Sequence, residues 1–243
     1  MVEPAARYEE LKIALPESAH GTEQVSAVLG IPRWWPTGAR LGVVLAHGAG
    51  SDLNDPVVSY LHRELTERRF LSLSFNFPFA ERRTPGGKTK RPDPMPVLRR
   101  CFRAAIGALA RDPTAAPAHL FLAGKGLGAQ VAADLSISRI RADGLILMSY
   151  PLHPAGKPEQ IEAEQLYRVV APMLFVQGTR DRHCELGVLR QTLSRVGAPT
   201  ALYVAQEADH QLKIPKKATR TEEEVHGEML GVVDSWIDKI LEV

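Results

Sequence analysis

Three closely spaced glycines, in the segment Gly124-Lys125-Gly126-Leu127-Gly128, constrain the fold of this 243-residue chain more than any other feature. The preceding residues, His119 to Ala123, have the apolar composition of a short buried strand. The residues from Gly128 to Leu135 have the composition of a helix start. The sequence therefore predicts a sharp strand-to-helix turn with Gly126 at its apex. Such a turn usually requires a positive φ, which glycine adopts without steric cost.

The rest of the chain alternates apolar runs with amphipathic segments. We expect buried strands at 41–46, 70–75, 144–149, 173–177 and 200–204. We expect helices at 56–69, 94–111, 128–135 and 184–196, a short one near 160–167, and a last one with Val225, Met229, Val232, Trp236 and Ile240 on one face. Two further strands, 8–15 and 24–31, flank a turn at 17–21 and predict an antiparallel edge. This alternation predicts a three-layer α/β fold, a mostly parallel sheet with helices on both faces, in a single domain over residues 1–243.

The composition narrows the class of protein. The formal net charge of +2 gives no reason to expect nucleic acid as a partner, and two cysteines are too few for a disulfide framework. The first residues lack the apolar run of a secretory leader, and no apolar run reaches about 18 residues. We therefore expect a cytoplasmic protein without a secretory leader or a membrane span. We expect no metal ion and no cofactor.

Three segments that follow predicted strands carry residues suited to catalysis. Sites in such sheets lie at the carboxyl ends of the strands. His47-Gly48-Ala49-Gly50 can aim backbone amides at a developing oxyanion, Asp181 can orient a histidine, and His210 can act as a general base. Each also has an ordinary explanation, namely a glycine turn, a capping aspartate and an exposed histidine. Their order along the chain makes the combination more informative than its parts.

The order of the Gly126 turn, Asp181 and His210 resembles that of nucleophile, acid and base in α/β-hydrolases. In that fold the turn has the form Gly-x-Ser-x-Gly, and its serine is the nucleophile. Here Gly126 occupies the serine position, so the nucleophile is missing. The resemblance implies an α/β-hydrolase fold with Asp181 and His210 as catalytic residues. It also implies an oxyanion hole built from the amides of Ala49 and Leu127.

A more specific resemblance rests on four segments: His47-Gly48-Ala49-Gly50-Ser51-Asp52, Phe75-Asn76-Phe77-Pro78-Phe79, Lys90-Arg91-Pro92-Asp93-Pro94 and the Gly126 turn. Together they resemble the α/β-hydrolase-like family of nonspecific-lethal-complex subunit 3 and the testis-expressed proteins. The bacterial members of that family resemble dienelactone-hydrolase relatives. The resemblance covers roughly residues 41–210, and members generally carry Gly-Lys-Ser where this chain has Gly-Lys-Gly. On this resemblance we expect His47, Asn76 and Phe79 to contact the substrate.

Other residues are weaker candidates for the nucleophile. Cys184 lies near a predicted helix start, where a thiolate is favoured, but packing explains it more simply. Cys101 falls in the middle of a predicted helix and is expected in the core. Ser51 and Ser149 end strands without a sharp turn, and the side chain of Lys125 is expected to point away from the pocket.

Three interpretations therefore remain open. The chain is a nucleophile-null form of a serine esterase-like hydrolase acting on a small ester-like or anionic molecule, or a noncatalytic binding or scaffold protein that kept the pocket. In the third interpretation, Asp181 and His210 activate water directly. Retention of both residues favours the first. Two basic groups follow strands at the same edge, either as ordinary solvated surface, which we favour, or as a rim that attracts anionic substrates. They are Arg82, Arg83, Lys88, Lys90 and Arg91, and Lys213, Lys216, Lys217 and Arg220.

Overall fold

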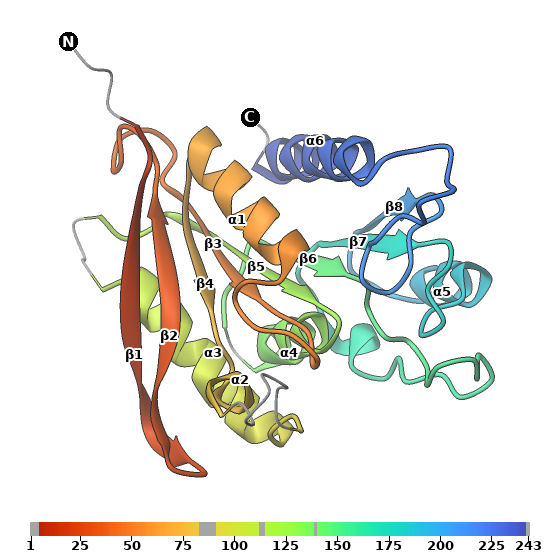
Figure 1. Ribbon diagram of the computed structural model, residues 1–243, viewed down its shortest axis with the longest axis horizontal. Helices are drawn as coiled ribbons and strands as arrows, with labels where there is room; N and C mark the ends of the chain where they lie inside the picture. The colour runs from red at the N-terminus through yellow and green to blue at the C-terminus, as the bar shows by residue number, and fades with distance from the viewer. Residues whose placement is uncertain (1–4, 83–90, 112–114, 139, 242–243) are drawn as a thin grey trace. The chain divides into compact units, whose positions relative to one another are not determined.

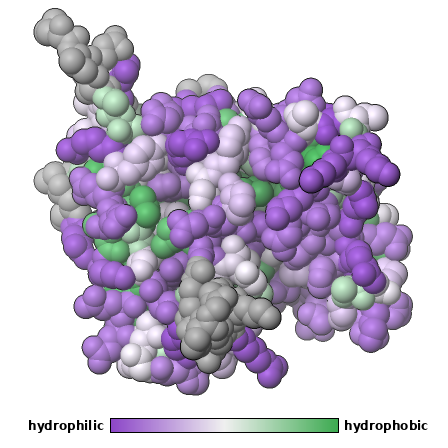
Figure 2. Space-filling view, viewed as in Figure 1, coloured by the Kyte–Doolittle hydropathy of each residue, from purple (hydrophilic) through white to green (hydrophobic). Residues whose placement is uncertain are grey.

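The computed structural model describes residues 5–82, 91–111, 115–138 and 140–241. The chain divides into two compact units, Met1–Ala123 and Gly124–Val243, and the division falls inside strand β5, His119–Lys125. No helix among the described residues is long and apolar enough to cross a membrane. On the face shown in Figure 2, hydrophilic residues cover most of the described surface and hydrophobic ones show only in small patches.

The strands of the first unit confirm the predicted edge. In this unit the strands follow the order β1, β2, β4, β3, β5. Strand β1 (Arg7–Ala19) pairs antiparallel with β2 (Thr22–Ile31), and β2 pairs antiparallel with β4 (Phe70–Phe75). Strand β3 (Leu41–Ala46) is fully buried and runs parallel to β4. The turn between β1 and β2 is tighter than expected because β1 continues to Ala19 (Figure 1).

The helices of the first unit begin at proline-containing segments, as the sequence predicts. Helix α1 (Pro56–Arg68) starts at Asp55, whose Oδ1 accepts hydrogen bonds from the amides of Val57 and Val58. A short helix, α2 (Pro78–Glu81), is not among the helices that the sequence predicts. Helix α3 (Met95–Leu109) packs against β1 and buries Cys101 in the core, as expected.

The second unit holds the remaining strands, β6 (Gly144–Met148), β7 (Met173–Gly178) and β8 (Thr200–Ala205). They are parallel, with Leu145 opposite Met173 and Met173 opposite Thr200. Its helices are α4 (Leu127–Ile137), α5 (Leu186–Leu193) and α6 (Glu222–Leu241). Figure 1 shows α6 on one side of these strands and α4 and α5 on the other. The eight-stranded, mostly parallel sheet with helices confirms the predicted fold class.

Three helical predictions are corrected in detail. Helix α5 begins at Leu186 rather than Cys184, because residues 179–185 form a turn around Asp181. The short helix near 160–167 is only a 3-10 turn, η1 (Leu166–Arg168). In α6, Val232 and Ile240 are only half-buried, since the buried face follows a stripe shifted by about one residue. That stripe consists of Val225, His226, Met229, Leu230, Val233, Trp236 and Ile237.

The buried ring of His62 on α1 makes the stability of the protein depend on pH. Burial lowers the pKa of His62 from 6.5 to about 4, and its Nε2 has no hydrogen-bond partner among the described residues. Between these two pH values the unfolded chain binds a proton that the folded chain does not. The free energy of unfolding therefore falls as the pH falls through this window, by about 3 kcal/mol in total for this group.

We predict that His62→Leu removes most of this pH dependence. Between pH 7 and pH 4.5, the free energy of unfolding should fall by about 2 kcal/mol less in the variant than in the parent protein. Urea unfolding at the two pH values measures the difference. The variant Leu61→Met, at a buried position of the same helix without a titratable group, serves as the control and keeps the parental pH dependence. An unchanged pH dependence in His62→Leu contradicts the prediction.

Candidate active site

The glycine turn has the geometry that the sequence predicts. Gly126 is the single residue between β5 and α4, with φ 54° and ψ −116°. Its carbonyl accepts hydrogen bonds from the amides of Ala129 and Gln130, at 3.0 and 3.2 Å, which starts the helix. Its amide donates to the carbonyl of Met148 at 2.9 Å. The turn is therefore fixed to its own helix and to the carboxyl end of β6.

Close packing explains the glycine two residues before the apex. A Cβ placed on Gly124 would lie 2.3 Å from the carbonyl carbon and oxygen of Gly128 and 2.5 Å from the amide nitrogen of Ala129. All three are backbone atoms of the first turn of α4, so they cannot move aside as a flexible side chain does. The helix starts directly against the end of the strand, and only glycine at position 124 leaves it room.

Asp181 lies just beyond β7 and is almost fully buried, with 7% of its surface exposed. Its Oδ1 accepts a hydrogen bond from the amide of His183 at 2.8 Å. Its Oδ2 accepts from Nε2 of Gln177 at 2.6 Å and from Nδ1 of His210 at 2.8 Å. These three donors fix the carboxylate in one orientation and compensate for its burial.

His210 follows β8 and completes an acid–base pair with Asp181. Because Nδ1 donates to the carboxylate, we assign the neutral ring the tautomer in which Nε2 carries no proton. The side chain is 27% exposed, and Nε2 makes no hydrogen bond to any described residue. Nε2 is thus free to accept a proton from a bound molecule, and Asp181 stabilises the imidazolium that results.

His183 packs its ring beside that of His210, with the ring centroids 4.5 Å apart. Burial and the neighbouring His210 lower the pKa of His183. His183 therefore stays neutral beside the acid–base pair near pH 7. Its backbone amide, rather than its ring, holds Asp181.

A side-chain hydrogen bond joins the glycine turn to the His210 loop. Nζ of the buried Lys125 donates to Oε1 of Gln211 at 2.8 Å. Lys125 and Gln211 are the immediate neighbours of Gly126 and His210, so the bond holds the two segments side by side. Sequence reasoning missed this pair, because nothing local relates residues that lie 86 positions apart.

The loops after β7 and β8 are also tied together through backbone contacts. The amide of Arg180 donates to the carbonyl of Ala208 at 2.9 Å, and the amide of Glu207 donates to Oγ1 of Thr179 at 2.9 Å. A Cβ on Gly178 would lie 2.3 Å from the carbonyl oxygen of Ala208. Asp181 and His210 therefore stand on loops that are packed directly against each other.

The structure places the expected substrate-binding residues of the first unit in a packed cluster. His47 is buried; its Nε2 accepts a hydrogen bond from the amide of Phe77 at 3.0 Å, and its Nδ1 lies 2.8 Å from the carbonyl oxygen of Gly48. Phe79 is fully buried against the ring of His47. Asn76 accepts from the amide of Leu53 at 2.7 Å through Oδ1 and donates to Glu81 at 3.0 Å through Nδ2. All three side chains are therefore engaged by neighbours within this unit, and their contact with a substrate stays a prediction.

The two residues expected to form an oxyanion hole lie in different units. Ala49 is exposed at the end of the His47 loop, and Leu127 is the first residue of α4. Their joint role stays a prediction.

The alternative nucleophiles do not occupy a comparable turn. Burial and the nearby Asp181 raise the pKa of Cys184 to about 12, so its thiol stays protonated. Burial also raises the pKa of Cys101, and Ser51 donates to Asp55 at 2.9 Å. Ser149 has a positive φ of 46° at the end of β6, but its side chain is completely buried.

The basic residues are in part held by acidic ones. Arg82 forms an ion pair with the buried Asp93, and Arg220 forms one with Glu228. Arg83, Lys88 and Lys90 lie outside the described residues. Within the described ranges, no three His, Cys, Asp or Glu side chains are grouped closely enough to hold a metal ion.

Comparison with known proteins agrees with the α/β fold described above. Residues 39–238 match the model of a family described as an alpha/beta hydrolase domain. An esterase from Pyrococcus furiosus is 15% identical, with a TM-score of 0.73 over 97% of this chain and 91% of that chain. A dienelactone hydrolase from Anabaena variabilis is 19% identical, with a TM-score of 0.69 over 94% and 97%. An alpha-beta serine hydrolase homologue from Coxiella burnetii is 19% identical, with a TM-score of 0.68 over 92% and 94%. At these identities the structures are similar in fold.

The close contact at Gly124 predicts that Gly124→Ala lowers the free energy of unfolding by about 1–3 kcal/mol, because the new methyl group meets backbone atoms. Gly107→Ala is the matched control, since a Cβ at this position of α3 has no atom within 4 Å. Alanine there should stabilise the helix by about 0.5–1 kcal/mol. Chemical denaturation measures both changes, and equal effects at the two positions contradict the packing argument.

Proposed function

Because this chain belongs to the alpha/beta hydrolase domain family, we propose that it is an esterase-like hydrolase whose acid and base are intact and whose nucleophile is absent. The hydrogen bond of 2.8 Å between Nδ1 of His210 and Oδ2 of Asp181 carries this proposal. It pairs a general base with the carboxylate that orients it, after the two strands where such a hydrolase holds them. Gly126 stands at the position of the nucleophile with a φ of 54°.

The proposed chemistry follows from what each group can supply. In a serine hydrolase the base takes the proton of the serine hydroxyl, the oxygen attacks the ester carbonyl, and backbone amides stabilise the resulting oxyanion. In this chain His210 can accept a proton, and Asp181 can stabilise the resulting imidazolium. The amides of Leu127 and Ala49 are the proposed oxyanion donors. Gly126 offers no hydroxyl, so no covalent acyl intermediate forms at this position.

We propose a small ester-like or anionic molecule as the ligand of this site. The known esterase and dienelactone hydrolase with the same fold support an acyl compound as the ancestral substrate class. A noncatalytic binding protein is the second candidate, and the glycine at position 126 is the observation that favours it. Direct activation of water by His210 is the third, and the unoccupied Nε2 is compatible with it.

We predict that the chain as it stands is nearly inert toward esters. Without a nucleophile, binding and oxyanion stabilisation alone leave a residual acceleration of roughly 10³ to 10⁴ over water. The measurement is the turnover of p-nitrophenyl acetate, which should stay well below about 1 s⁻¹. Turnover at that rate or above refutes the prediction, and its loss in His210→Ala then assigns the activity to water activation.

We predict that Gly126→Ser restores hydrolysis and lowers stability. The hydroxyl gives His210 a proton to take, so the variant should hydrolyse p-nitrophenyl acetate and react with a fluorophosphonate probe at position 126. The turn requires a positive φ, in which a residue with a Cβ is strained, and this strain costs about 1–3 kcal/mol of stability. The melting temperature should fall by about 2–4 °C for each kcal/mol.

Gly126→Ala is the matched control for this gain, because it adds the Cβ without the hydroxyl. It should lose the same stability and gain no activity. Adding Asp181→Asn to Gly126→Ser should reduce the restored kcat by about 10⁴, since the histidine then takes the wrong tautomer. If Gly126→Ser folds and neither hydrolyses the ester nor labels, the binding-protein interpretation replaces the proposal.

A further inference from the structure

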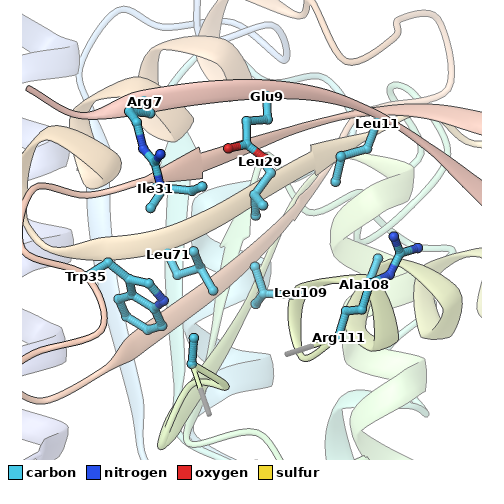
Figure 3. Close-up of a pocket in the computed structure, with 11 residues that line it drawn as sticks. Arg7, Glu9, Leu11, Leu29, Ile31, Trp35, Leu71, Ala108, Leu109 and Arg111 are labelled. Carbon is cyan, nitrogen blue, oxygen red and sulfur yellow. The ribbon is translucent and has the colours of Figure 1, made fainter. Parts of the chain in front are cut away.

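A separate cavity of about 410 Å³ lies in the first unit, between the β1–β2 hairpin and the last turn of α3 (Figure 3). This volume falls within the range of small-molecule sites in proteins. It contains none of the residues of the candidate active site. Its lining residues are Arg7, Glu9, Leu11, Leu29, Ile31, Trp35, Leu71, Ala108, Leu109, Arg111 and Ala115.

The walls of this cavity are apolar. In the hairpin, Ile31 lies opposite Arg7 and Leu29 lies opposite Glu9, so both apolar side chains share one face of the sheet. Leu71 and Leu109 are buried at its floor. The side chain of Trp35 borders it, as Figure 3 shows. Such walls favour a ligand with a hydrocarbon portion.

The charged groups of the cavity are exposed and lack partners. The side chains of Arg7, Glu9 and Arg111 form no hydrogen bond or ion pair with any described residue. Among the described lining residues, two side chains are cationic and one is anionic, which favours a ligand that carries a negative charge. Figure 3 shows Arg7 and Arg111 on opposite sides of the cavity.

The two arginines differ in their surroundings. Arg7 and Glu9 are two residues apart on one strand, so their side chains point to the same face and the carboxylate offsets the charge of Arg7. Arg111 follows α3 and has no acidic residue among the other lining residues on its side (Figure 3). Among the described lining residues, Arg111 is therefore the cation without a carboxylate on its own side of the cavity.

We propose that this cavity binds an apolar monocarboxylate of medium chain length, with the carboxylate at Arg111 and the hydrocarbon chain against Leu109, Leu71 and Leu29. A neutral molecule of the same length leaves Arg111 without a partner, and a second negative charge meets Glu9. The proposal does not depend on the function of the Gly126 site, because it uses a different cavity.

A second cavity of about 520 Å³ also borders Arg111. It runs along β1 and α3 past Ile13, Leu15 and Ala104, and it shares Ala108 and Arg111 with the first. Arg111 thus lies where the two cavities meet. Binding should strengthen by about three- to fourfold for each methylene added between hexanoate and decanoate.

Calorimetric titration of the full chain with sodium octanoate at low salt tests the proposal. We expect one octanoate per chain, and no comparable heat from octanol or inorganic phosphate. Arg111→Gln should weaken binding about tenfold, as loss of a charge-assisted hydrogen bond does. Arg7→Gln is the matched control within the same cavity and should change the affinity less than about threefold. Equal losses in the two variants overturn the assignment of Arg111.

A cavity-filling variant locates the ligand. Ala108→Phe should abolish octanoate binding, whereas Ala110→Phe, at an exposed position two residues later, should leave it unchanged. Melting curves check that both variants fold. If Ala108→Phe does not fold, the comparison of Arg111→Gln with Arg7→Gln tests the proposal. Absence of binding for all chain lengths overturns the proposal. So does a dimer in sedimentation velocity that Ala108→Phe dissociates, because a second copy then covers this face.

Discussion

The close approach of α4 to the end of β5 is the constraint on which the candidate site depends. The backbone of Gly128 lies so near Gly124 that a Cβ at 124 would be 2.3 Å away from it. A strand can pass into a helix over a single residue only if that residue takes a rare conformation, and Gly126 does so at φ 54°. In this conformation residue 126 lies at the carboxyl edge of the strands, where Asp181 and His210 also lie. Serine at 126 would be strained in this conformation, and glycine is not.

The fold could be predicted from the sequence largely because its strands are continuous apolar runs. For β3 and β4 the expected bounds match the structure, since both strands are buried along their whole length and end at polar or charged residues. The Gly126 turn was equally predictable, because only glycine spacing of this kind allows such a close contact. The face of α6 was predicted in part. Val225, Met229 and Trp236 are buried as expected, but Val233 and Ile237 are buried in place of Val232 and Ile240, since adjacent Val and Ile residues fit a helical period equally well.

The contacts that organise the site were not predictable in the same way. The order of residues along the chain placed Asp181 and His210 at neighbouring strand ends, and the structure joins them. The hydrogen bond of Lys125 with Gln211, and those of Gln177 and His183 with Asp181, depend on side chains meeting after the chain has folded. A glutamine at the end of an apolar strand was the one local sign that a buried polar partner would be needed. The hydrogen bonds and ring contacts of His47, Asn76 and Phe79 were likewise not predictable, because their partners meet them only in the folded protein.

Unsatisfied and strained groups lie near the Gly126 turn, at the ends of β6 and β7. Ser149 has a positive φ of 46° and a buried hydroxyl with no hydrogen-bond partner among the described residues. Its neighbour on β7, Gln177, buries an Oε1 that also lacks a partner among those residues. Each such feature costs free energy, and a site without any function gains stability when mutations remove it. Both groups lie at the ends of β6 and β7, beside the ordered Asp181, and such costs are typical of residues that serve binding or catalysis rather than stability.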